Sequence, residues 1–472
     1  MTTVSPRAAG VYDSFADAIG NTPLVRLNRV TGDITATVYV KLEYLNPGGS
    51  VKDRAARAML LAAEESGELR PGGTVVEASS GNTGLGLAAV AASRGYRTIV
   101  VVPDRVSGEK VQLLRAHGAE VHLTPGLRPV DHPEHLRTVA LRLVSEIPGA
   151  WFAGQYDNPA NPAAHRATTG PEIWTQTEGR VTHFVAGIGT GGTISGTGEY
   201  LKEASGGAVR VIGADPESSV YGGGDGRIWY VEAVGHFVHP ATETDLWPDS
   251  YNRDVVDRIE RIPDIDAIRV LHRLAREEGL LLGGSSGTAI VAALRIAREL
   301  GPEDVVVVIA PDSGRAYLSK YYSDEWLGAL GFPLTSAVEG RTVGDLAGLT
   351  DTANTAVAVP SGATVAVAKQ LLGSGTALPV VLQRKASGPA VVAEVLGSIT
   401  AETLSGAPED DLVSGHLGAP LPTVGTTESL AGAAARIAGH TGPVLVVREG
   451  RVIALLDAAQ IVDENVENEG GV

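Results

Sequence analysis

Short apolar runs alternate with helical patterns over most of the chain. Residues 98–102 and 305–310 are rich in β-branched side chains, and a proline follows each run. Such unbroken apolar runs are typical of strands that are buried on both faces of a parallel sheet. Segments rich in Ala and Leu lie between the runs and predict helices. The pattern therefore predicts an α/β fold in which helices cover a parallel sheet.

From about residue 13 to residue 327 the chain repeats one unit, a strand followed by a glycine-rich turn and a helix. Two copies are clear: a strand at 75–78, a loop at 79–84 and a helix at 85–93; and a strand at 183–186, a loop at 187–192 and a helix that runs to Glu203. Such units place their loops at the carboxyl ends of the strands, where α/β folds bind ligands. We therefore look for chemistry in the loops.

Past Gly331 the pattern changes to an internal duplication. Residues 362–383 and 425–448 resemble each other at an offset of about 64 residues, and each pairs an Ala-rich helix with a short apolar strand. One copy cannot bury its apolar face alone, whereas two copies packed together can. The tail is therefore predicted to be a tandem domain pair.

Composition narrows the function classes. The chain has 472 residues, which predicts about three domains, and its net charge of −17 opposes binding to nucleic acid. It has no Cys, which excludes disulfides and thiolate metal sites. Loose histidine pairs such as His132 with His135 do not amount to a metal site, and no apolar stretch is long enough to span a bilayer. We expect a soluble, cytoplasmic protein with no metal.

The first candidate loop is 46–54, which contains Ser50 and Lys52. Its glycines and serine predict a helix start, so Lys52 lies in the first turn, where the positive end of the helix disfavours a second cation. A lysine that can lose its proton near neutral pH suits a Schiff base with an aldehyde cofactor. The alternative is an ordinary solvated lysine.

Three further loops follow predicted strands. The polar loop 77–86 contains Ser79, Asn82 and Thr83 and suits a carboxylate, or it is simply a capped turn. The loop 187–193 is rich in glycine and suits a phosphate, but it carries no lysine after its last glycine, so a small phosphorylated cofactor fits better than a nucleotide. Ser313 can hydrogen-bond a ring nitrogen, or it belongs to a plain turn.

Taken together and in this order, the loops resemble the fold-type II family of pyridoxal-phosphate enzymes, and within it the cystathionine β-synthase and cysteine synthase group. The matching segments are 21–24, 49–54, 80–84, 155–156, 189–193, 283–287 and 311–314. Simple cysteine synthases end near the catalytic core, whereas cystathionine β-synthases commonly continue into a tandem regulatory pair. The chain therefore looks like a bacterial, haem-free cystathionine β-synthase.

The resemblance implies a set of domains. We expect a pyridoxal-phosphate dependent core at 1–335, with a mobile subdomain at about 45–150, a linker at 336–342, and a tandem regulatory (Bateman-type) module at 343–472. The two repeats of that module would span about 343–410 and 411–472. Relatives pair through the core, so we expect a homodimer or a homotetramer.

The resemblance also implies a reaction, in which serine loses its hydroxyl and homocysteine adds through its thiolate to give cystathionine. Lys52 would hold the cofactor as an imine and move the α-proton. Besides Lys52, the cofactor-binding residues would be Asn82, Gly189, Thr190, Gly191, Gly192, Thr193 and Ser313. The substrate-binding residues would be Ser79, Ser80, Gly81, Thr83, Gln155 and Tyr156. The alternatives are a cysteine synthase that uses O-acetylserine and sulfide, a specialised enzyme with another nucleophile, and a catalytically dead nucleotide sensor.

Two segments depart from the family pattern. Relatives usually have Gly in place of Ala233, Tyr or Glu in place of His236, and Asp in place of Phe237. In relatives, this segment (231–240) lines the side of the pocket that receives the second substrate. In the tail, nucleoside-binding repeats tend to end in Thr-x-x-Asp; the first repeat has Thr400 with Thr403, and the second has Ala454 with Asp457. S-adenosylmethionine or an adenine nucleotide is therefore one expectation for the tail, and a purely structural role is the other.

Overall fold

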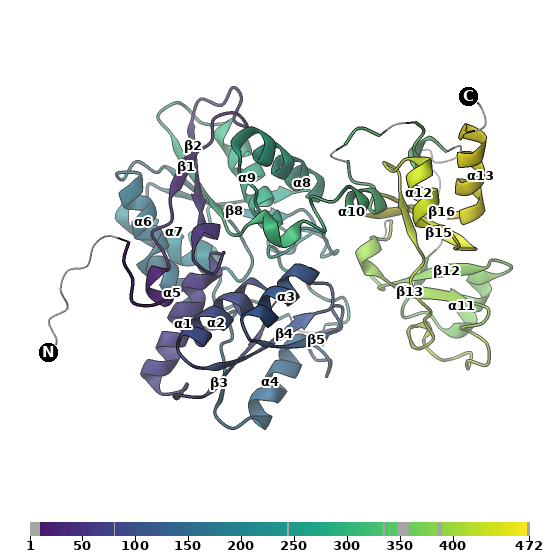
Figure 1. The fold of residues 1–472 in the computed structure, drawn as a ribbon, viewed down its shortest axis with the longest axis horizontal. Helices are drawn as coiled ribbons and strands as arrows, with labels where there is room; N and C mark the ends of the chain where they lie inside the picture. The colour runs from purple at the N-terminus through teal and green to yellow at the C-terminus, as the bar shows by residue number, and fades with distance from the viewer. Residues whose placement is uncertain are drawn as a thin grey trace. The chain divides into compact units, whose positions relative to one another are not determined.

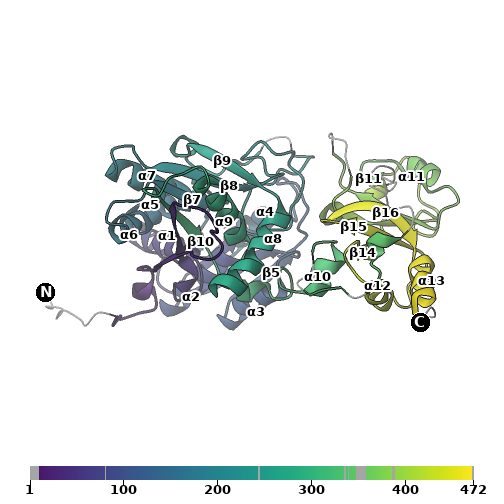
Figure 2. The same ribbon diagram turned by 90° about the horizontal axis from the view of Figure 1, so that it is seen from above.

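The computed structural model describes residues 10–79, 81–242, 245–333, 336–338, 340–346, 358–384 and 389–469. The chain divides into two compact units, one made of Met1–Gly226 and Val231–Tyr317, the other of Arg227–Tyr230 and Leu318–Val472. No helix of the described residues is long and apolar enough to cross a bilayer. Figure 1 shows the elements of both units, and Figure 2 shows them from a second direction.

The larger sheet of the first unit is six-stranded within the described residues and runs in the order β1-β2-β10-β7-β8-β9. Its strands pair in parallel except for β1, which is antiparallel to β2. The strands are β1 (Leu24–Arg26), β2 (Thr37–Leu42), β7 (His183–Gly187), β8 (Arg210–Pro216), β9 (Arg258–Ile262) and β10 (Val305–Ala310). The apolar run at 305–310 is therefore a central strand, as its continuous burial requires.

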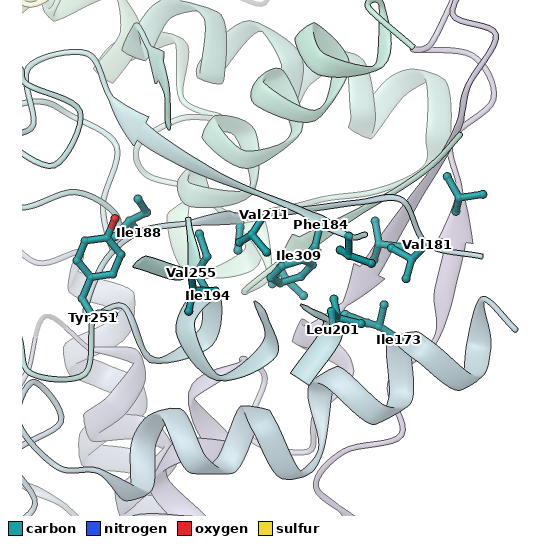
Figure 3. Close-up of a cluster of buried hydrophobic side chains, with 14 of the residues drawn as sticks. Ile173, Val181, Phe184, Ile188, Ile194, Leu201, Val211, Tyr251, Val255 and Ile309 are labelled. Atoms are coloured by element: carbon teal, nitrogen blue, oxygen red, sulfur yellow. The ribbon is translucent and has the colours of Figure 1, made fainter. Parts of the chain in front are cut away.

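Helices of the first unit pack on this sheet and on one another. They are α1 (Lys52–Ser66), α5 (Ala160–Ala167), α6 (Thr169–Gln176), α7 (Gly192–Ala204), α8 (Asp264–Arg273) and α9 (Gly284–Ala297). Figure 3 shows Ile173 of α6 and Leu201 of α7 meeting strand residues such as Phe184 in one buried cluster. This cluster fixes the end of β7 relative to the start of α7, which are the two elements that flank the glycine-rich loop.

A second parallel sheet in the first unit has the strand order β5-β4-β3-β6. Its strands are β3 (Thr74–Ala78), β4 (Arg97–Pro103), β5 (Glu120–Thr124) and β6 (Ala150–Phe152), and its helices are α2 (Asn82–Ser93), α3 (Gly108–Ala116) and α4 (Leu136–Glu146). The predicted strand at 75–78 is present. The helix after it begins at Asn82 rather than at residue 85, because its glycines and Thr83 continue the helical backbone.

The second unit repeats one topology twice. In each copy a first strand pairs in parallel with a second strand, which pairs antiparallel with a third, and both copies have a register shift in the antiparallel pair. The first copy is β11 (Val359–Pro360), α11 (Val365–Leu372), β12 (Ala377–Val381) and β13 (Val395–Thr400); the second is β14 (Thr423–Gly425), α12 (Leu430–Arg436), β15 (Pro443–Arg448) and β16 (Arg451–Asp457). Helix α13 (Ala458–Glu469) follows. The duplication read from the sequence is therefore a duplication of structure.

The boundary between the units differs from the expected linker at 336–342. The second unit begins at Leu318 and contains helix α10 (Asp324–Ala329). Trp326 of this helix stacks on Phe332 with ring centroids 6.0 Å apart, and both rings contact Tyr230. Residues 318–332 are held by aromatic packing within the second unit, which is why they do not belong to the core.

Residues 227–230 belong to the second unit although they lie in the middle of the core sequence. The Tyr230 hydroxyl donates to the Gly450 carbonyl oxygen over 2.7 Å and accepts from the Ala393 N–H over 3.2 Å. Arg227 donates to the Pro389 carbonyl oxygen over 2.7 Å. Both repeats of the second unit therefore hold the same tyrosine.

Candidate active site

A pocket in the first unit lies where the ends of β7 and β10 meet the starts of α1, α2 and α7. It encloses about 470 Å³ of empty space, part of which is open to solvent. Its lining residues come from these strand ends, the helix starts and one further loop: Val51, Lys52, Asn82, Ala186, Gly187, Gly189, Thr190, Gly191, Thr193, Ala233, Ile309 and Pro311. Carboxyl ends of parallel strands are the expected position for a ligand in such a fold. Four separately predicted sequence segments therefore meet in one pocket.

Lys52 is the first residue of α1 and faces this pocket. Its backbone N–H donates to the Ser50 hydroxyl over 3.2 Å, and its Nζ lies 3.5 Å from Thr190 Oγ1. Burial lowers the pKa of Lys52 to about 8, against a smaller opposing effect of Glu77. The direction agrees with the predicted loss of basicity, and burial is its largest cause. A neutral amine is therefore accessible near physiological pH.

The loop 187–193 joins β7 to α7 and contributes Gly189, Thr190, Gly191 and Thr193 to the pocket wall. Gly191 has a φ of +85°, and a Cβ there would overlap the side chain of Tyr251. A larger residue would therefore clash with Tyr251 and strain the backbone of the loop. The loop ends at the N-terminus of α7, where free backbone N–H groups favour an anion. The Thr190 and Thr193 side chains line the same wall.

Gly192 is the first residue of α7, and a Cβ there would overlap the side chain of Asn161 on α5. Glycine at this position therefore permits close packing between the loop and α5, and its expected role in cofactor binding stays a prediction.

The loop after β3 provides hydrogen-bonding groups for a carboxylate. The Ser79 hydroxyl accepts from the N–H groups of Gly81 and Gly84 over 3.1 and 3.3 Å, so its own hydrogen remains available. Thr83 instead donates its hydroxyl hydrogen to the side-chain oxygen of Gln155 over 2.5 Å. The loop thus brings Gln155 to the start of α2, as the resemblance implies. Ser80 lies outside the described residues.

Asn82 is held in the pocket by a residue that the sequence analysis did not select. Its side-chain nitrogen donates to Asp312 Oδ2 over 2.7 Å, and the Tyr317 hydroxyl donates to the same oxygen over 2.5 Å. Asp312 is buried, and burial raises its pKa. The Asn82 amide therefore keeps its oxygen and its second hydrogen for a ligand. The only sequence signal was the position of Asp312 directly before Ser313.

Ser313 and Tyr156 do not belong to the pocket wall as defined above, and neither do Ser79, Gly81, Thr83, Gln155 and Gly192. Ser313 follows the lining residue Pro311 by two positions, and its hydroxyl accepts from the Arg315 N–H over 3.3 Å. Its own hydrogen can still be donated to a ring nitrogen. Tyr156 is 40% exposed, and its carbonyl oxygen accepts from the Ser250 N–H. Tyr156 thus borders the surface beside Gln155.

Glu77 is a second residue that the sequence analysis did not select. It is buried at the end of β3, where the Gln155 side chain and the backbone of Gly154 and Gln155 act to lower its pKa. Burial raises the pKa of Glu77 to about 8. Thr83 holds the oxygen end of the Gln155 amide, and Glu77 is sensitive to the same side chain.

The departing segment 231–240 reaches the pocket at Ala233. This residue has a φ of +66°, a conformation that favours glycine, and it lines the pocket beside Gly189 of the glycine-rich loop. His236 stacks on Tyr221 with centroids 5.1 Å apart and contacts Asp245 at 2.9 Å, and the Tyr221 hydroxyl donates to the Gly189 carbonyl oxygen over 2.8 Å. The segment is thus anchored against the glycine-rich loop.

These features fit pyridoxal phosphate: a half-buried lysine of lowered pKa, a glycine-rich loop at a helix start, an amide and a hydroxyl at strand ends. The family model of pyridoxal-phosphate dependent enzymes matches residues 15–312. The chain belongs to this family. Among the described residues no group of three or more His, Asp or Glu side chains could hold a metal ion.

Curated relatives place the chain in the cystathionine β-synthase and cysteine synthase group of this family. A cystathionine β-synthase of Apis mellifera is 44% identical over 67% of this chain and 62% of its own length. A probable cysteine synthase of Bacillus subtilis is 46% identical over 66% of this chain and 96% of its own length. The chain thus matches less than two thirds of the Apis protein.

Solved structures agree with this placement. An O-acetylserine dependent cystathionine β-synthase from Helicobacter pylori is 38% identical with a TM-score of 0.60, over 66% of this chain and 98% of its own. An O-ureido-L-serine synthase is 39% identical with the same TM-score of 0.60, over 66% of this chain and 94% of its own. The chain is therefore a pyridoxal-phosphate dependent enzyme of a β-replacement family.

Proposed function

We propose that the protein condenses L-serine with L-homocysteine to give L-cystathionine and water. The C–O bond at the β-carbon of serine breaks and a C–S bond forms, so that the hydroxyl leaves as water with the proton of the thiol. The proposal fixes two choices that the family leaves open, namely the leaving group and the nucleophile.

The second unit is the observation that carries the choice of cystathionine β-synthase over cysteine synthase. The match uses 96% of the Bacillus subtilis cysteine synthase but only 59% of the Rattus norvegicus cystathionine β-synthase. The latter has a large part outside the matched core, and so does this chain, whose second unit runs from Leu318 to Val472. A duplicated unit beyond the core supports the longer type of enzyme.

Lys52 supplies the acid–base chemistry in this proposal. Bound pyridoxal phosphate supplies a carbonyl carbon for covalent attachment and a ring that withdraws electrons from the α-carbon. Because the pKa of Lys52 is lowered to about 8, its amine can take up the α-proton of the substrate and return it later. Ser313 would pair with the ring nitrogen without charging it, which favours loss of the β-substituent over transamination.

The substrate carboxylate would lie at the start of α2. Ser79, Thr83 and Gln155 gather there, and the hydrogen bonds of Ser79 leave its hydroxyl hydrogen available. The backbone of Gly81 completes the proposed carboxylate site, with Tyr156 at its edge, and the role expected for Ser80 stays a prediction. Asn82, oriented by Asp312, would hold the ring oxygen of the cofactor.

The nucleophile is the choice that most needs an experiment. The Helicobacter pylori relative is named for O-acetylserine, and another relative makes O-ureido-L-serine, so related pockets serve other leaving groups and nucleophiles. Ala233 and His236 stand at the segment where this chain departs from the family pattern. A cysteine synthase reaction with O-acetylserine and sulfide is therefore the second candidate, and another nucleophile is the third.

The second unit is proposed as the place where S-adenosylmethionine or an adenine nucleotide would act. Thr400 and Thr403 hydrogen-bond each other: each backbone N–H donates to the other hydroxyl, over 2.9 and 3.1 Å. Asp457 accepts from the Ala459 N–H over 3.0 Å. These side chains hydrogen-bond to backbone groups of their own segments. A purely structural role for the second unit is therefore supported equally well. A ligand-dependent rise in melting temperature would distinguish the two roles.

Product analysis of the purified enzyme tests the proposed reaction. Serine and O-acetylserine would each be combined with homocysteine, sulfide and cysteine, and Lys52→Ala would serve as the inactive control. Cystathionine formed most efficiently from serine and homocysteine supports the proposal. A higher kcat/KM for cysteine from O-acetylserine and sulfide would replace it with the second candidate.

A further inference from the structure

Helix α5 directs two buried polar side chains at the glycine-rich loop. Asn161 and His165 are four positions apart, so they lie on the same face of the helix, and they are 1% and 0% exposed. Asn161 Nδ2 lies 3.1 Å from Thr190 Oγ1, and His165 Nε2 lies 3.2 Å from Thr193 Oγ1. One helix face thus contacts both threonines of the pocket wall.

The Asn161 amide can have only one orientation. Its Nδ2 also donates to the Gln155 carbonyl oxygen over 2.8 Å, and a carbonyl oxygen cannot face the amide oxygen favourably. The two hydrogens of Nδ2 therefore go to Gln155 and to Thr190. Because Thr190 Oγ1 accepts in this contact, its own hydrogen is left to donate into the pocket.

The His165 ring bridges two threonine hydroxyls. Nδ1 lies 2.9 Å from Thr169 Oγ1, and within the described part of the chain this ring nitrogen is the hydrogen-bond partner of that buried hydroxyl. A buried hydroxyl donor needs an acceptor, so Thr169 donates to Nδ1. Burial, aided by the positive charges of Arg54 and Lys52, lowers the pKa of His165, which keeps the ring neutral.

A neutral imidazole that accepts at Nδ1 carries its hydrogen on Nε2. Nε2 therefore donates to Thr193 Oγ1, and the hydroxyl hydrogen of Thr193 points elsewhere. Thr190 and Thr193 therefore have the same hydrogen-bonding pattern, although their partners differ. Each hydroxyl oxygen accepts a hydrogen bond from a side chain of α5, and each hydroxyl hydrogen is left to be donated into the pocket.

The packing between α5 and α7 keeps these contacts short. A Cβ on Gly192 would overlap the Asn161 side chain, and a Cβ on Gly196 would overlap the Pro162 carbonyl. Glycine at both positions lets the two helices approach closely. The glycines of this segment therefore serve the contact with α5 as well as the backbone of the loop.

We propose that Asn161 and His165 are positioning residues that make the Thr190 and Thr193 hydroxyls hydrogen-bond donors to the cofactor phosphate. A phosphate dianion accepts hydrogen bonds only, and the loop 187–193 contains no Lys or Arg to neutralise it. The direction of each hydroxyl hydrogen therefore decides whether it attracts or repels the phosphate. The proposal rests on the cofactor of the family and is independent of which substrates the enzyme uses.

Binding of pyridoxal 5′-phosphate and of pyridoxal to the apoenzyme tests the proposal without turnover. His165→Phe removes both ring nitrogens and is expected to weaken binding of pyridoxal 5′-phosphate roughly 10- to 100-fold, the effect of one hydrogen bond to a charged group. Binding of pyridoxal, which has no phosphate, is expected to stay unchanged. His165→Gln keeps a donor at the Thr193 end and is expected to recover most of the affinity.

A double-mutant cycle separates positioning from general support of the fold. In a Thr193→Val background the hydroxyl is absent, so His165→Phe should add little further loss. Asn161→Leu provides a second, independent arm with Thr190→Val as its partner. The matched control is Thr168→Val, because the Thr168 hydroxyl donates only to the Ala164 carbonyl oxygen within the described residues and does not reach the loop.

Equal losses for pyridoxal and pyridoxal 5′-phosphate would overturn the proposal, as would a full His165→Phe effect in the Thr193→Val background. If His165→Phe does not fold, as judged by melting of the apoenzyme, His165→Gln and the Asn161 arm decide the question by the same comparison.

Discussion

The hydroxyl of Thr83 donates to the side-chain oxygen of Gln155 over 2.5 Å, and the Gln155 side chain acts to lower the pKa of the buried Glu77. The contact with Thr83 orients the Gln155 amide, with its oxygen toward Thr83. The three residues act as one unit at the start of α2. Two of the predictions below follow from this unit.

Thr83→Val leaves the Gln155 oxygen without its donor. We expect KM for the amino-acid substrate that binds first to rise roughly tenfold, because an unsatisfied buried acceptor costs ~1–3 kcal/mol, while kcat changes less. Steady-state kinetics against serine measure this. Thr177→Val is the matched control, since that buried hydroxyl donates to the Ile173 carbonyl oxygen on its own helix. An unchanged KM would show that Gln155 does not hold the substrate.

Glu77→Gln should change how stability depends on pH. The pKa of Glu77 is raised from 4.5 to about 8, so the folded state holds a proton that the unfolded state has lost between these pH values. The wild-type apoenzyme therefore loses stability as pH rises from about 5 to about 8 through this group, and the variant should lose less. Melting temperatures at both ends of this range test it. Equal pH dependence in both proteins would show that Glu77 does not titrate in this way.

Lys52 should react with the cofactor in a pH-dependent way. Its pKa is lowered to about 8, and only the neutral amine attacks an aldehyde, so the rate of attachment to the apoenzyme should rise as pH increases and level off above about 8. Stopped-flow absorbance follows the reaction. Because Glu77 raises the pKa of Lys52, Glu77→Gln should move the inflection to lower pH. An inflection near the ordinary value of 10.5 would contradict the burial of this amine.

Gly450→Ala should destabilise the second unit. Gly450 has a φ of +76°, and a Cβ there would overlap the ring of Tyr230. We expect a loss of ~1–3 kcal/mol in the free energy of unfolding, from overpacking and backbone strain together. Gly439→Ala is the matched control, because Gly439 has a φ of +83° with open space around its Cβ position. An equal loss of unfolding free energy in the two variants would mean that the Tyr230 ring moves aside without a measurable loss of stability.

The parts of the fold that the sequence predicted are those with a local signal. The strand at 305–310 and the start of α1 at Lys52 follow from burial of β-branched residues and from turn chemistry, and the structure confirms them. The duplicated tail was visible because its two copies repeat the same order of helix and strand. The local sequence pattern is therefore sufficient to predict the structure of a segment whose conformation depends mainly on its own residues.

The residues that sequence reasoning missed act across elements. His165 and Asp312 each contact a predicted site residue that lies far away in the chain, 28 residues from His165 to Thr193 and 230 from Asp312 to Asn82. No periodicity or turn motif reports such a contact. The unit boundary at Leu318 was also not predicted, because it depends on contacts between distant segments. Tyr230 contacts Trp326 and Phe332, which follow Leu318 in the chain.

The segment Arg227–Tyr230 also limits how this protein can be rearranged by a single cut or splice. Shortening the chain after Tyr317 removes Gly450 and Ala393, so the Tyr230 hydroxyl of the truncated enzyme would lose both of these hydrogen-bond partners. Transplanting the tail onto another enzyme would equally require four residues to be grafted into the interior of the host sequence. Engineers who want either half alone must redesign this tetrapeptide first.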